Sequence, residues 1–240
     1  MASSSLPSLT LGYVPGATPA KWARIWAERH PEVPLTLRAV AAVDAAAEVR
    51  AGTVDVALLR LSSDTSGLSV IPLYDETTVA VVPTDHLLSA ADEISAADLD
   101  GEATLLPVDD VVGWREVHGR PVDHRPETTE DAMELVAAGM GVLIVPQSLA
   151  RLYGRRDLTY RPISDAPTCP VGLAFPEGPP SAQVDEFIGI VRGRKAGSSR
   201  GQSQPAPKRT AREKTLAKQA ARAAAGKVAR KPGPAKRARP

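Results

Sequence analysis

Apolar strand patterns and helix patterns alternate along the first quarter of the chain, and this alternation restricts the fold more than any other feature. Three strand patterns enclose two helix patterns, in the order 9–14, 19–30, 35–40, 44–52 and 54–61. The third strand pattern is apolar on both faces from Val56 to Leu59, as strands buried inside a parallel sheet are. A β-α-β-α-β order predicts a parallel sheet with right-handed crossovers, and therefore an α/β fold.

The same alternation continues to about residue 192. We expect strands at 77–83, 103–106, 142–146, 158–163 and 169–175, and helices at 130–138 and 181–191. Residues 109–120 are rich in turn formers and predict a loop. About 190 residues suffice for one sizeable core or for two small lobes.

Threonines stand at the expected starts of two helices. Thr18 precedes Pro19, a residue suited to the first helical position because its missing N–H costs nothing there. Thr128 and Asp131 have the spacing of a capping box, with Asp in place of the usual Glu. Both threonines are therefore predicted to be helix N-caps.

Charge is divided sharply at residue 193. Residues 193–240 hold 15 Lys and Arg and a single acid, Glu213, whereas residues 1–192 hold 14 Lys and Arg and 27 Asp and Glu. The near-neutral whole is thus an acidic body of about −13 joined to a basic tail of about +14. Only the tail suggests a polyanionic partner.

Several classes of protein are disfavoured by what the sequence contains. The single Cys169 excludes an internal disulfide framework and a multi-cysteine metal site. His118 and His124 share a turn-rich loop without a clear third ligand, so we expect no metal there. We find no catalytic or cofactor-binding motif and expect no enzyme and no cofactor. No membrane span and no secretory signal are expected, which predicts a cytoplasmic protein.

Four phrases in order make the body similar to a known family. They are Ala51-Gly-Thr-Val-Asp-Val-Ala-Leu-Leu-Arg60, Glu76 to Leu88 with its Val-Pro-Thr-Asp-His-Leu, Leu135 to Pro146 with its Val-Ala-Ala-Gly-Met-Gly, and Tyr160-Arg-Pro-Ile163 before the final helix. Together they resemble the effector-binding (substrate-binding) domain of LysR-type transcriptional regulators.

The resemblance implies a fold like that of the type 2 periplasmic binding proteins. Two Rossmann-like α/β lobes would be joined by two crossover segments, near Val82 and Ser164, with the ligand between the lobes. The domain would span 8–192, with lobe I at about 8–80 and 166–192 and lobe II at about 81–165, followed by the tail 193–240. The family's helix-turn-helix would precede Leu9, so we expect this chain to lack that operator-reading module.

Candidate ligand-binding residues lie where strands end and helices begin, because free N–H groups there favour an anion. In the two-lobe fold that the resemblance implies, two such places would face each other and hold a small polar or anionic metabolite. The candidates are Pro15, Gly16, Thr18, Arg60, Ser62, Thr128, Thr129 and Gln147. The alternative for the threonines is plain helix capping, and for Arg60 a surface or interlobe ion pair.

An apolar stripe of Trp22, Ile25 and Trp26 follows the first strand at helical spacing. Core packing is one interpretation. The other is a dimer interface, because the resemblance implies an antiparallel dimer in which the equivalent helix packs against the partner. A homodimer, or a heterodimer with a LysR-type regulator, is the expected assembly.

The tail is rich in Ala, Lys, Arg and Pro and resembles the tails of linker histones and actinobacterial nucleoid proteins. Such a segment cannot bury a core, and we expect it to be disordered alone and to bind nucleic acid independently of sequence. The residues predicted to contact phosphates are Lys208, Arg209, Arg212, Lys218, Arg222, Lys227, Arg230, Lys231, Lys236, Arg237 and Arg239. The alternative is a solubilising tail, or one that folds onto the acidic body.

The sequence therefore predicts a LysR-like effector-binding protein that acts in transcriptional regulation and contacts DNA, and with it the nucleoid, through its tail. A solute-binding protein, or a partner that modulates a full-length LysR-type regulator without binding DNA, is the alternative.

Overall fold

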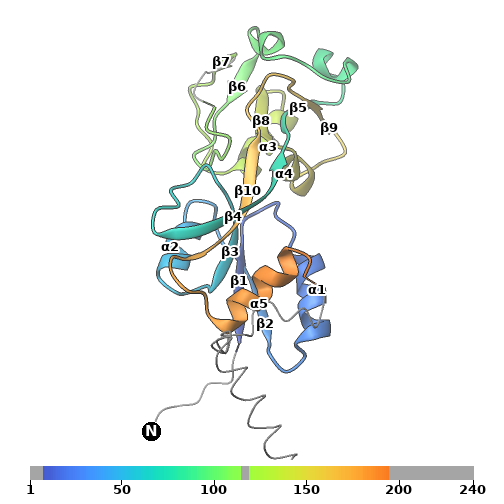
Figure 1. Ribbon diagram of the computed structural model, residues 1–240. Helices are drawn as coiled ribbons and strands as arrows, with labels where there is room; N and C mark the ends of the chain where they lie inside the picture. Colours follow the sequence, from blue (N-terminus) through green and yellow to red (C-terminus); the bar gives the residue numbers. More distant parts are fainter. Residues whose placement is uncertain (1–7, 115–118, 195–240) are drawn as a thin grey trace, which may run out of the picture. The chain divides into compact units, whose positions relative to one another are not determined.

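The computed structural model describes residues 8–114 and 119–194, which contain two five-stranded sheets (Figure 1). The first sheet has the order β2-β1-β3-β10-β4. Its strands are β1 (Leu9–Tyr13), β2 (Leu35–Ala39), β3 (Val56–Arg60), β4 (Leu68–Glu76) and β10 (Cys169–Pro176). β1 runs parallel to β2 and β3, as the β-α-β-α-β pattern predicts, whereas β10 is antiparallel to both of its neighbours.

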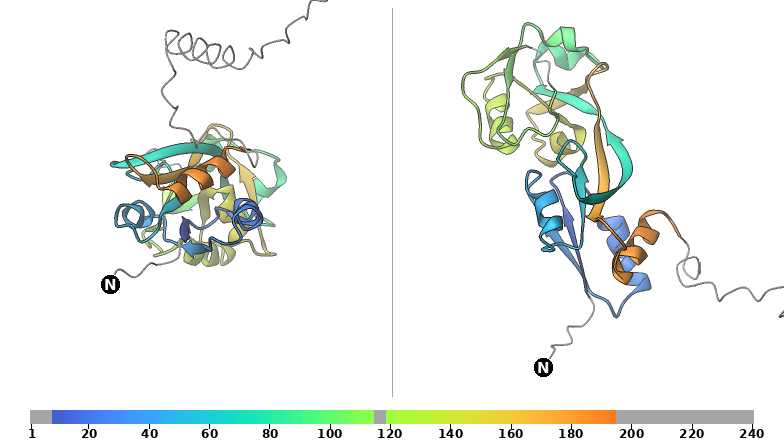
Figure 2. Two further views of the ribbon diagram at one scale, coloured as in Figure 1. Left: turned by 60° about the horizontal axis from the view of Figure 1, so that its bottom comes forward. Right: turned by 60° about the vertical axis from the view of Figure 1, so that its left-hand side comes forward.

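Helices cover both faces of the first sheet. α1 (Ala20–Arg29) and α5 (Ala182–Val191) lie side by side on one face, and α2 (Ala45–Arg50) lies on the other (Figures 1 and 2). Every residue of β3 is buried, because this strand is central and covered on both sides. Val56 to Leu59 are therefore buried on both faces of the sheet, as their apolar pattern predicted.

The second sheet has the order β7-β6-β8-β5-β9. Its strands are β5 (Thr78–Pro83), β6 (Ala103–Leu105), β7 (Arg120–Pro121), β8 (Val142–Pro146) and β9 (Leu158–Pro162). Its helices are α3 (Thr129–Ala137) and α4 (Gln147–Leu152), with the short 3-10 turns η1 (Leu87–Ala90) and η2 (Ala96–Leu99). An α/β fold built on two sheets is what the sequence predicted; the lobe limits given above remain a prediction.

The chain passes between the sheets at Thr77 and again between β9 and β10. The first passage lies earlier than the expected position near Val82, because Thr78–Pro83 pairs wholly with β8 and β9. β4 was not expected as a strand at all. It holds Pro72 beside a register shift opposite Val171 and Gly172, and a proline at a bulge hides the alternation that marks a strand.

The two predicted helix caps have different outcomes. Thr128 caps α3 as predicted: its hydroxyl oxygen accepts from the Asp131 N–H at 3.0 Å and donates to the Asp131 carboxylate at 2.7 Å. Thr18 does not cap α1, and that prediction is wrong. The cap position is Pro19, whose carbonyl accepts from the N–H groups of Trp22 and Ala23 but whose side chain has no acceptor, and no side-chain hydrogen bond caps α1.

Candidate functional site

Arg60 is the polar centre between the two sheets. It ends β3, and its side chain is only 1% exposed. Nε donates to Oε2 of Glu76 at 3.2 Å, and Nη2 donates to the Pro15 carbonyl and to Oγ of Ser148, both at 3.0 Å. Ser148 lies on α4, which packs against the second sheet. The guanidinium of Arg60 therefore joins the two halves of the body.

One nitrogen of Arg60 is left without a partner. Nη1 is buried and makes no hydrogen bond among the described residues, while Glu76 lies 3.1 Å from Nη2 and neutralises the charge. An unmet buried donor of this kind costs free energy. Arg60 therefore joins the two halves at some cost in stability.

Gly16 allows the two halves to approach each other. Its φ is +83°, and a Cβ built there would lie 2.5 Å from Ser148 Oγ and 3.1 Å from Arg60 Nη2. Only a residue without a Cβ fits this position without displacing the Arg60 hydrogen bonds.

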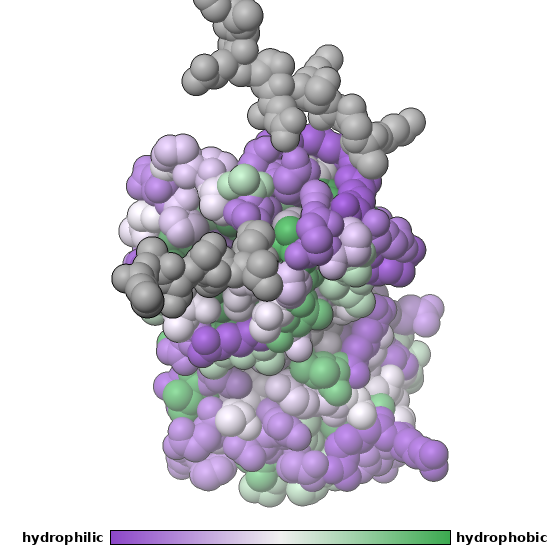
Figure 3. Space-filling model, turned by 90° about the horizontal axis from the view of Figure 1, so that it is seen from below, coloured by the Kyte–Doolittle hydropathy of each residue, from purple (hydrophilic) through white to green (hydrophobic). Residues whose placement is uncertain are grey.

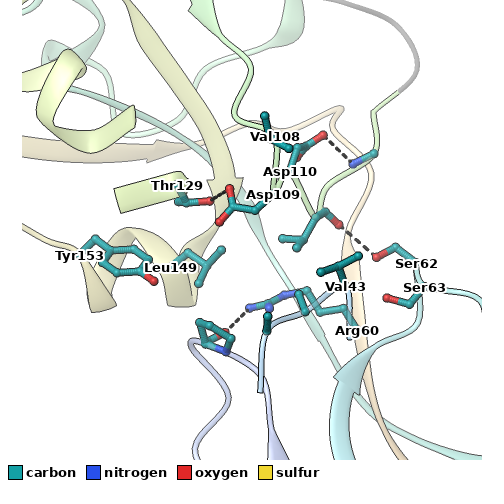
Figure 4. Close-up of a pocket in the computed structure, with 15 residues that line it drawn as sticks. Val43, Arg60, Ser62, Ser63, Val108, Asp109, Asp110, Thr129, Leu149 and Tyr153 are labelled. Atoms are coloured by element: carbon teal, nitrogen blue, oxygen red, sulfur yellow. Dashed lines mark hydrogen bonds between the residues drawn. The ribbon is translucent and has the colours of Figure 1, made fainter. Parts of the chain in front are cut away.

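A pocket of about 360 Å³ adjoins Arg60 and is lined from both halves of the body (Figure 4). The first half contributes Pro15, Ala41, Ala42, Val43, Arg60, Ser62 and Ser63, and the second contributes Val108, Asp109, Asp110, Val111, Gly113, Thr129, Leu149 and Tyr153. Its volume lies at the lower end of the roughly 300–1,000 Å³ of small-molecule sites. It is therefore large enough for one small molecule.

The polar groups of this pocket are mostly engaged with one another. Thr129 donates its hydroxyl to Oδ1 of Asp109 at 2.8 Å, and Ser62 donates to the Val111 carbonyl at 3.1 Å. The Asp110 carboxylate accepts from the N–H groups of Val112 and Gly113. Figure 4 shows Asp109 and Thr129 on one side of the pocket and Arg60 on the other.

The phenol of Tyr153, which lines the pocket, has a raised pKa. Burial is the main reason that the pKa of its phenol is raised, and the negative charges of Glu130 and Asp109 raise it further, against a smaller opposite effect of Arg60. The two acids therefore affect the pKa of the Tyr153 phenol more than Arg60 does.

The predicted ligand-binding residues separate into three groups. Pro15, Arg60, Ser62 and Thr129 lie together in the Arg60 pocket. Gly16 and Thr18 line a neighbouring, more open cavity of about 550 Å³, which shares Pro15 and Tyr153 with the first. Thr128 and Gln147 line neither of these two cavities; Thr128 is engaged in its cap, and the backbone N–H of Gln147 bonds to the Thr77 carbonyl.

Sequence reasoning missed the acids and the apolar rim of the pocket. Asp109, Val43 and Val108 come from turns or loops, where no periodic pattern reveals which way a side chain points. The one available signal was the Asp109-Asp110 pair inside a loop expected between two strands of an α/β lobe.

The proposed dimer residues have different surroundings. Trp26 is 1% exposed, donates its indole N–H to the Val33 carbonyl at 2.8 Å and packs against Phe187, so it is a core residue and not available to a partner. Trp22 and Ile25 are half-buried. Figure 3 views the body from the end that carries α1 and α5, and outside the grey atoms it shows small hydrophobic areas among hydrophilic ones.

Other predicted features can be placed only in part. The tail residues predicted to bind nucleic acid and His118 lie outside the described residues. Within 8–114 and 119–194 no group of His, Cys, Asp and Glu could hold a metal ion. In the same ranges no helix has the length and apolarity needed to cross a bilayer.

The structure is a two-lobed α/β domain with a pocket between its sheets. The family model described as "LysR substrate binding domain" matches residues 7–196. The chain therefore belongs to the family of LysR substrate-binding domains.

Relatives and solved structures agree with this assignment. The chain is 27% identical over 208 residues to the Hca operon transcriptional activator HcaR of Escherichia coli K12, covering 78% of this chain and 68% of that protein. It is 30% identical over 140 residues to a probable hydrogen peroxide-inducible genes activator of Mycobacterium leprae, covering 53% of this chain and 44% of that protein. The chain thus spans less than half the length of this mycobacterial relative.

Two solved structures share the fold at low identity. The effector-binding domain of BenM with its effector benzoate superposes with a TM-score of 0.66 at 18% identity, covering 79% of this chain and 92% of that one. The oxidized form of OxyR superposes with a TM-score of 0.64 at 22% identity, covering 79% of this chain and 96% of that one.

Proposed function

We propose that the body binds a small polar metabolite between its two halves and acts as the effector-sensing part of a transcriptional regulator. The observation that carries this proposal is the Arg60 pocket, a cavity of about 360 Å³ that is lined from both halves of the body. Relatives such as HcaR are transcriptional regulators, which supports the regulatory role.

Ligand binding would favour the arrangement in which the two halves meet. Because both halves line the pocket, a ligand gains contacts from each only when Arg60 and Ser148 are close. A ligand can shift the equilibrium between separated and closed halves only if it binds the closed arrangement more tightly. Closure of the two halves would therefore be the signal that the ligand is bound.

A thermal-shift screen of carboxylates and amino acids tests the sensing role. At a ligand concentration about 100-fold above Kd, binding adds about 2.7 kcal/mol to the free energy of unfolding. For a body of this size that corresponds to a rise in Tm of roughly 5–10 °C. The expected result is a hit that is lost in Thr129→Val and Ser62→Ala combined; a complete metabolite panel without any stabilising compound contradicts the proposal.

We also propose that the basic tail binds DNA without sequence preference. Its support is the charge division, with 15 Lys and Arg against one acid in residues 193–240. A tail-less chain for comparison has to keep Arg194, because Arg194 pairs with Asp185 and its carbonyl accepts from Arg29. We therefore choose a truncation after Ala196, which leaves the 1–196 chain.

A gel-shift titration of the full chain and of the 1–196 chain decides this point. The full chain is expected to bind duplex DNA at low salt, with affinity falling steeply as salt rises, whereas the 1–196 chain should not bind. Each neutralised phosphate adds about 0.9 to the log–log salt slope. Equal binding by both chains, or no binding by either at low salt, rules out the tail as a DNA-binding segment.

A dimer built on α1 and the edge strand β2 is the assembly that we propose. Trp22 and Ile25 are half-buried on α1, and Leu37 on β2 is 43% exposed. Sedimentation velocity of Trp22→Lys should then give a monomer where the unchanged chain gives a dimer. A monomer in both, or a dimer in both, contradicts this placement of the interface.

A further inference from the structure

His86 is the N-cap of the 3-10 turn η1 and stands in the Val-Pro-Thr-Asp-His-Leu phrase of the sequence. Its Nδ1 accepts a hydrogen bond from the N–H of Leu88 at 3.2 Å. The imidazole thus does what a Ser, Thr, Asp or Asn side chain usually does at the start of a helix. Because Nδ1 is the acceptor, the neutral ring carries its proton on Nε2.

The second ring nitrogen of His86 reaches a different element. Nε2 lies 3.3 Å from Oε2 of Glu102, which directly precedes β6, and both side chains are about one-quarter exposed. A neutral imidazole with its proton on Nε2 satisfies both neighbours at once, since one nitrogen accepts and the other donates. His86 therefore caps η1 and also ties it to the start of β6.

η1 is attached to the second sheet at both of its ends. Leu88 packs against a hydrophobic cluster that includes Val82 and Ile94. At the far end, Arg161 on the edge strand β9 donates to the carbonyls of Ser89 and Ala91. The guanidinium keeps its charge at every physiological pH, whereas the imidazole at the near end does not.

A second proton on His86 removes the cap. Histidine gains its charge between about pH 8 and pH 5, and the imidazolium has two N–H donors and no acceptor. The N–H of Leu88 then faces another N–H group and loses its partner. The contact of Nε2 with Glu102 persists as an ion pair, so protonation breaks one of the two contacts and keeps the other.

The charged groups around His86 do not replace the lost acceptor. Glu102 is the acid that faces the ring, on the Nε2 side, and Arg120 donates its backbone N–H to the Glu102 carbonyl. Asp85 precedes His86 in the chain, and Asp157, whose carbonyl accepts from Thr84, has its carboxylate already paired with an arginine. No hydrogen bond between the Leu88 N–H and any of these acids occurs among the described residues.

We propose that η1 is a proton-sensitive turn of the second half of the body: neutral His86 caps it, and protonation of Nδ1 releases its first turn while Arg161 holds its end. A serine or asparagine would cap this turn at every pH, so the imidazole gives the turn a response to acid. The proposal does not depend on metabolite sensing or on the tail.

Hydrogen exchange of the full chain at pH 8 and pH 5 measures the release of η1. The observable is the protection of the Leu88 amide relative to its intrinsic exchange rate at each pH. Protection should fall at least about tenfold from pH 8 to pH 5, whereas peptides from β8 should change less than about threefold. A loss of the same size in β8 would mean that the whole body opens, and would overturn a local response of η1.

Two substitutions at the same position separate the two nitrogens of the ring. His86→Asn places an oxygen near the position of Nδ1 that caps η1 and takes up no proton, so Leu88 should stay protected at both pH values. His86→Gln places its amide near the position of Nε2 and lacks the cap, so protection should be low at both. Circular dichroism at pH 8 checks that both variants fold.

The possible outcomes bear directly on His86. Equal protection of Leu88 at pH 8 and pH 5 in the unchanged chain overturns the proposal. A fall in His86→Asn as large as in the unchanged chain assigns the response to another group and overturns it as well. Nitrogen-15 NMR gives an independent readout, with the His86 signals identified by their loss in His86→Asn: a proton on Nδ1 at pH 8 would show that His86 does not cap η1.

Discussion

Arg60 shows how one residue can serve both the fold and the site. Its Nε and Nη2 bind groups of the protein, including Ser148 on the far side of the pocket, while Nη1 has no partner among the described residues. A buried ion pair gives little net stability, yet removing one partner leaves the other charge buried alone. The residue is thus costly to remove even where its pair contributes little.

We predict that Arg60→Met destabilises the body by about 3–5 kcal/mol, because Glu76 is left buried without its counter-charge. The double variant Arg60→Met with Glu76→Leu should recover most of that loss, since no charge remains to be buried. Urea unfolding followed by tryptophan fluorescence measures both. A double variant as unstable as the single one would show that the hydrogen bonds of Arg60, rather than its charge, hold the site together.

One thiol and two phenols with raised pKa values predict a loss of stability at alkaline pH. Burial raises the pKa of the Cys169 thiol and of the Tyr74 and Tyr153 phenols, and the charge of Glu76 raises that of Tyr74 further. Each group is neutral in the fold and ionises more readily in the unfolded chain. The stabilisation is complete below the unfolded pKa values, about 8.5 for Cys and about 10 for Tyr, and is lost as pH rises through the folded ones.

Urea unfolding between pH 7 and pH 10.5 measures this effect. The free energy of unfolding should fall above about pH 8.5, and in Cys169→Ala the fall should begin at higher pH, because only the tyrosines remain. An unchanged pH profile in Cys169→Ala would mean that the thiol does not contribute.

At the scale of elements, helices α3 and α1 begin differently, although the sequence predicted a threonine N-cap for both. Thr128 makes the cap bond to the Asp131 N–H, whereas no side chain caps α1 and Thr18 is exposed. A hydroxyl stabilises the start of a helix only where it accepts a hydrogen bond from one of the first N–H groups, as Thr128 does and Thr18 does not.

Thr128→Ala should therefore cost about 1 kcal/mol, the usual value for a lost N-cap, and Thr18→Ala less than about 0.5 kcal/mol. The two substitutions remove the same atoms, so each is the control for the other. Thermal unfolding of the two variants side by side decides between them, and equal losses would contradict the assignment of the caps.

At the scale of the whole body, Gly16 governs how closely the two halves approach. Gly16→Ala places a methyl group against Ser148 and Arg60, and we expect it to hold the halves apart and to lower effector affinity at least about tenfold. Gly52→Ala is the matched control: its φ of +70° imposes similar backbone strain, and a Cβ there meets nothing within 4 Å.

Small-angle scattering of the 1–196 chain measures this separation. The radius of gyration should increase in Gly16→Ala and stay unchanged in Gly52→Ala. If both variants scatter as the unsubstituted 1–196 chain does, side-chain movement has absorbed the methyl group and Gly16 does not control closure.

Local patterns predicted most of the elements but few of the contacts. The strands around Val56 and Val142 and the cap at Thr128 depend on residues within a strand or a helical turn, which the sequence displays directly. β4 was missed because Pro72 and a bulge interrupt its alternation. For Trp26 the sequence left core packing and a dimer interface both open, since periodicity reveals a helix face but not which neighbour covers it.

The sequence by itself determined the α/β class, the buried central strand, the α3 cap and the division of charge at residue 193, because each depends on near neighbours or on composition. Tertiary structure decided the site. Arg60 reaches Pro15 across 45 positions and Ser148 across 88, and Asp109 meets Thr129 across 20. Such contacts depend on how the sheets and loops come together, so no local period encodes which acid faces which base.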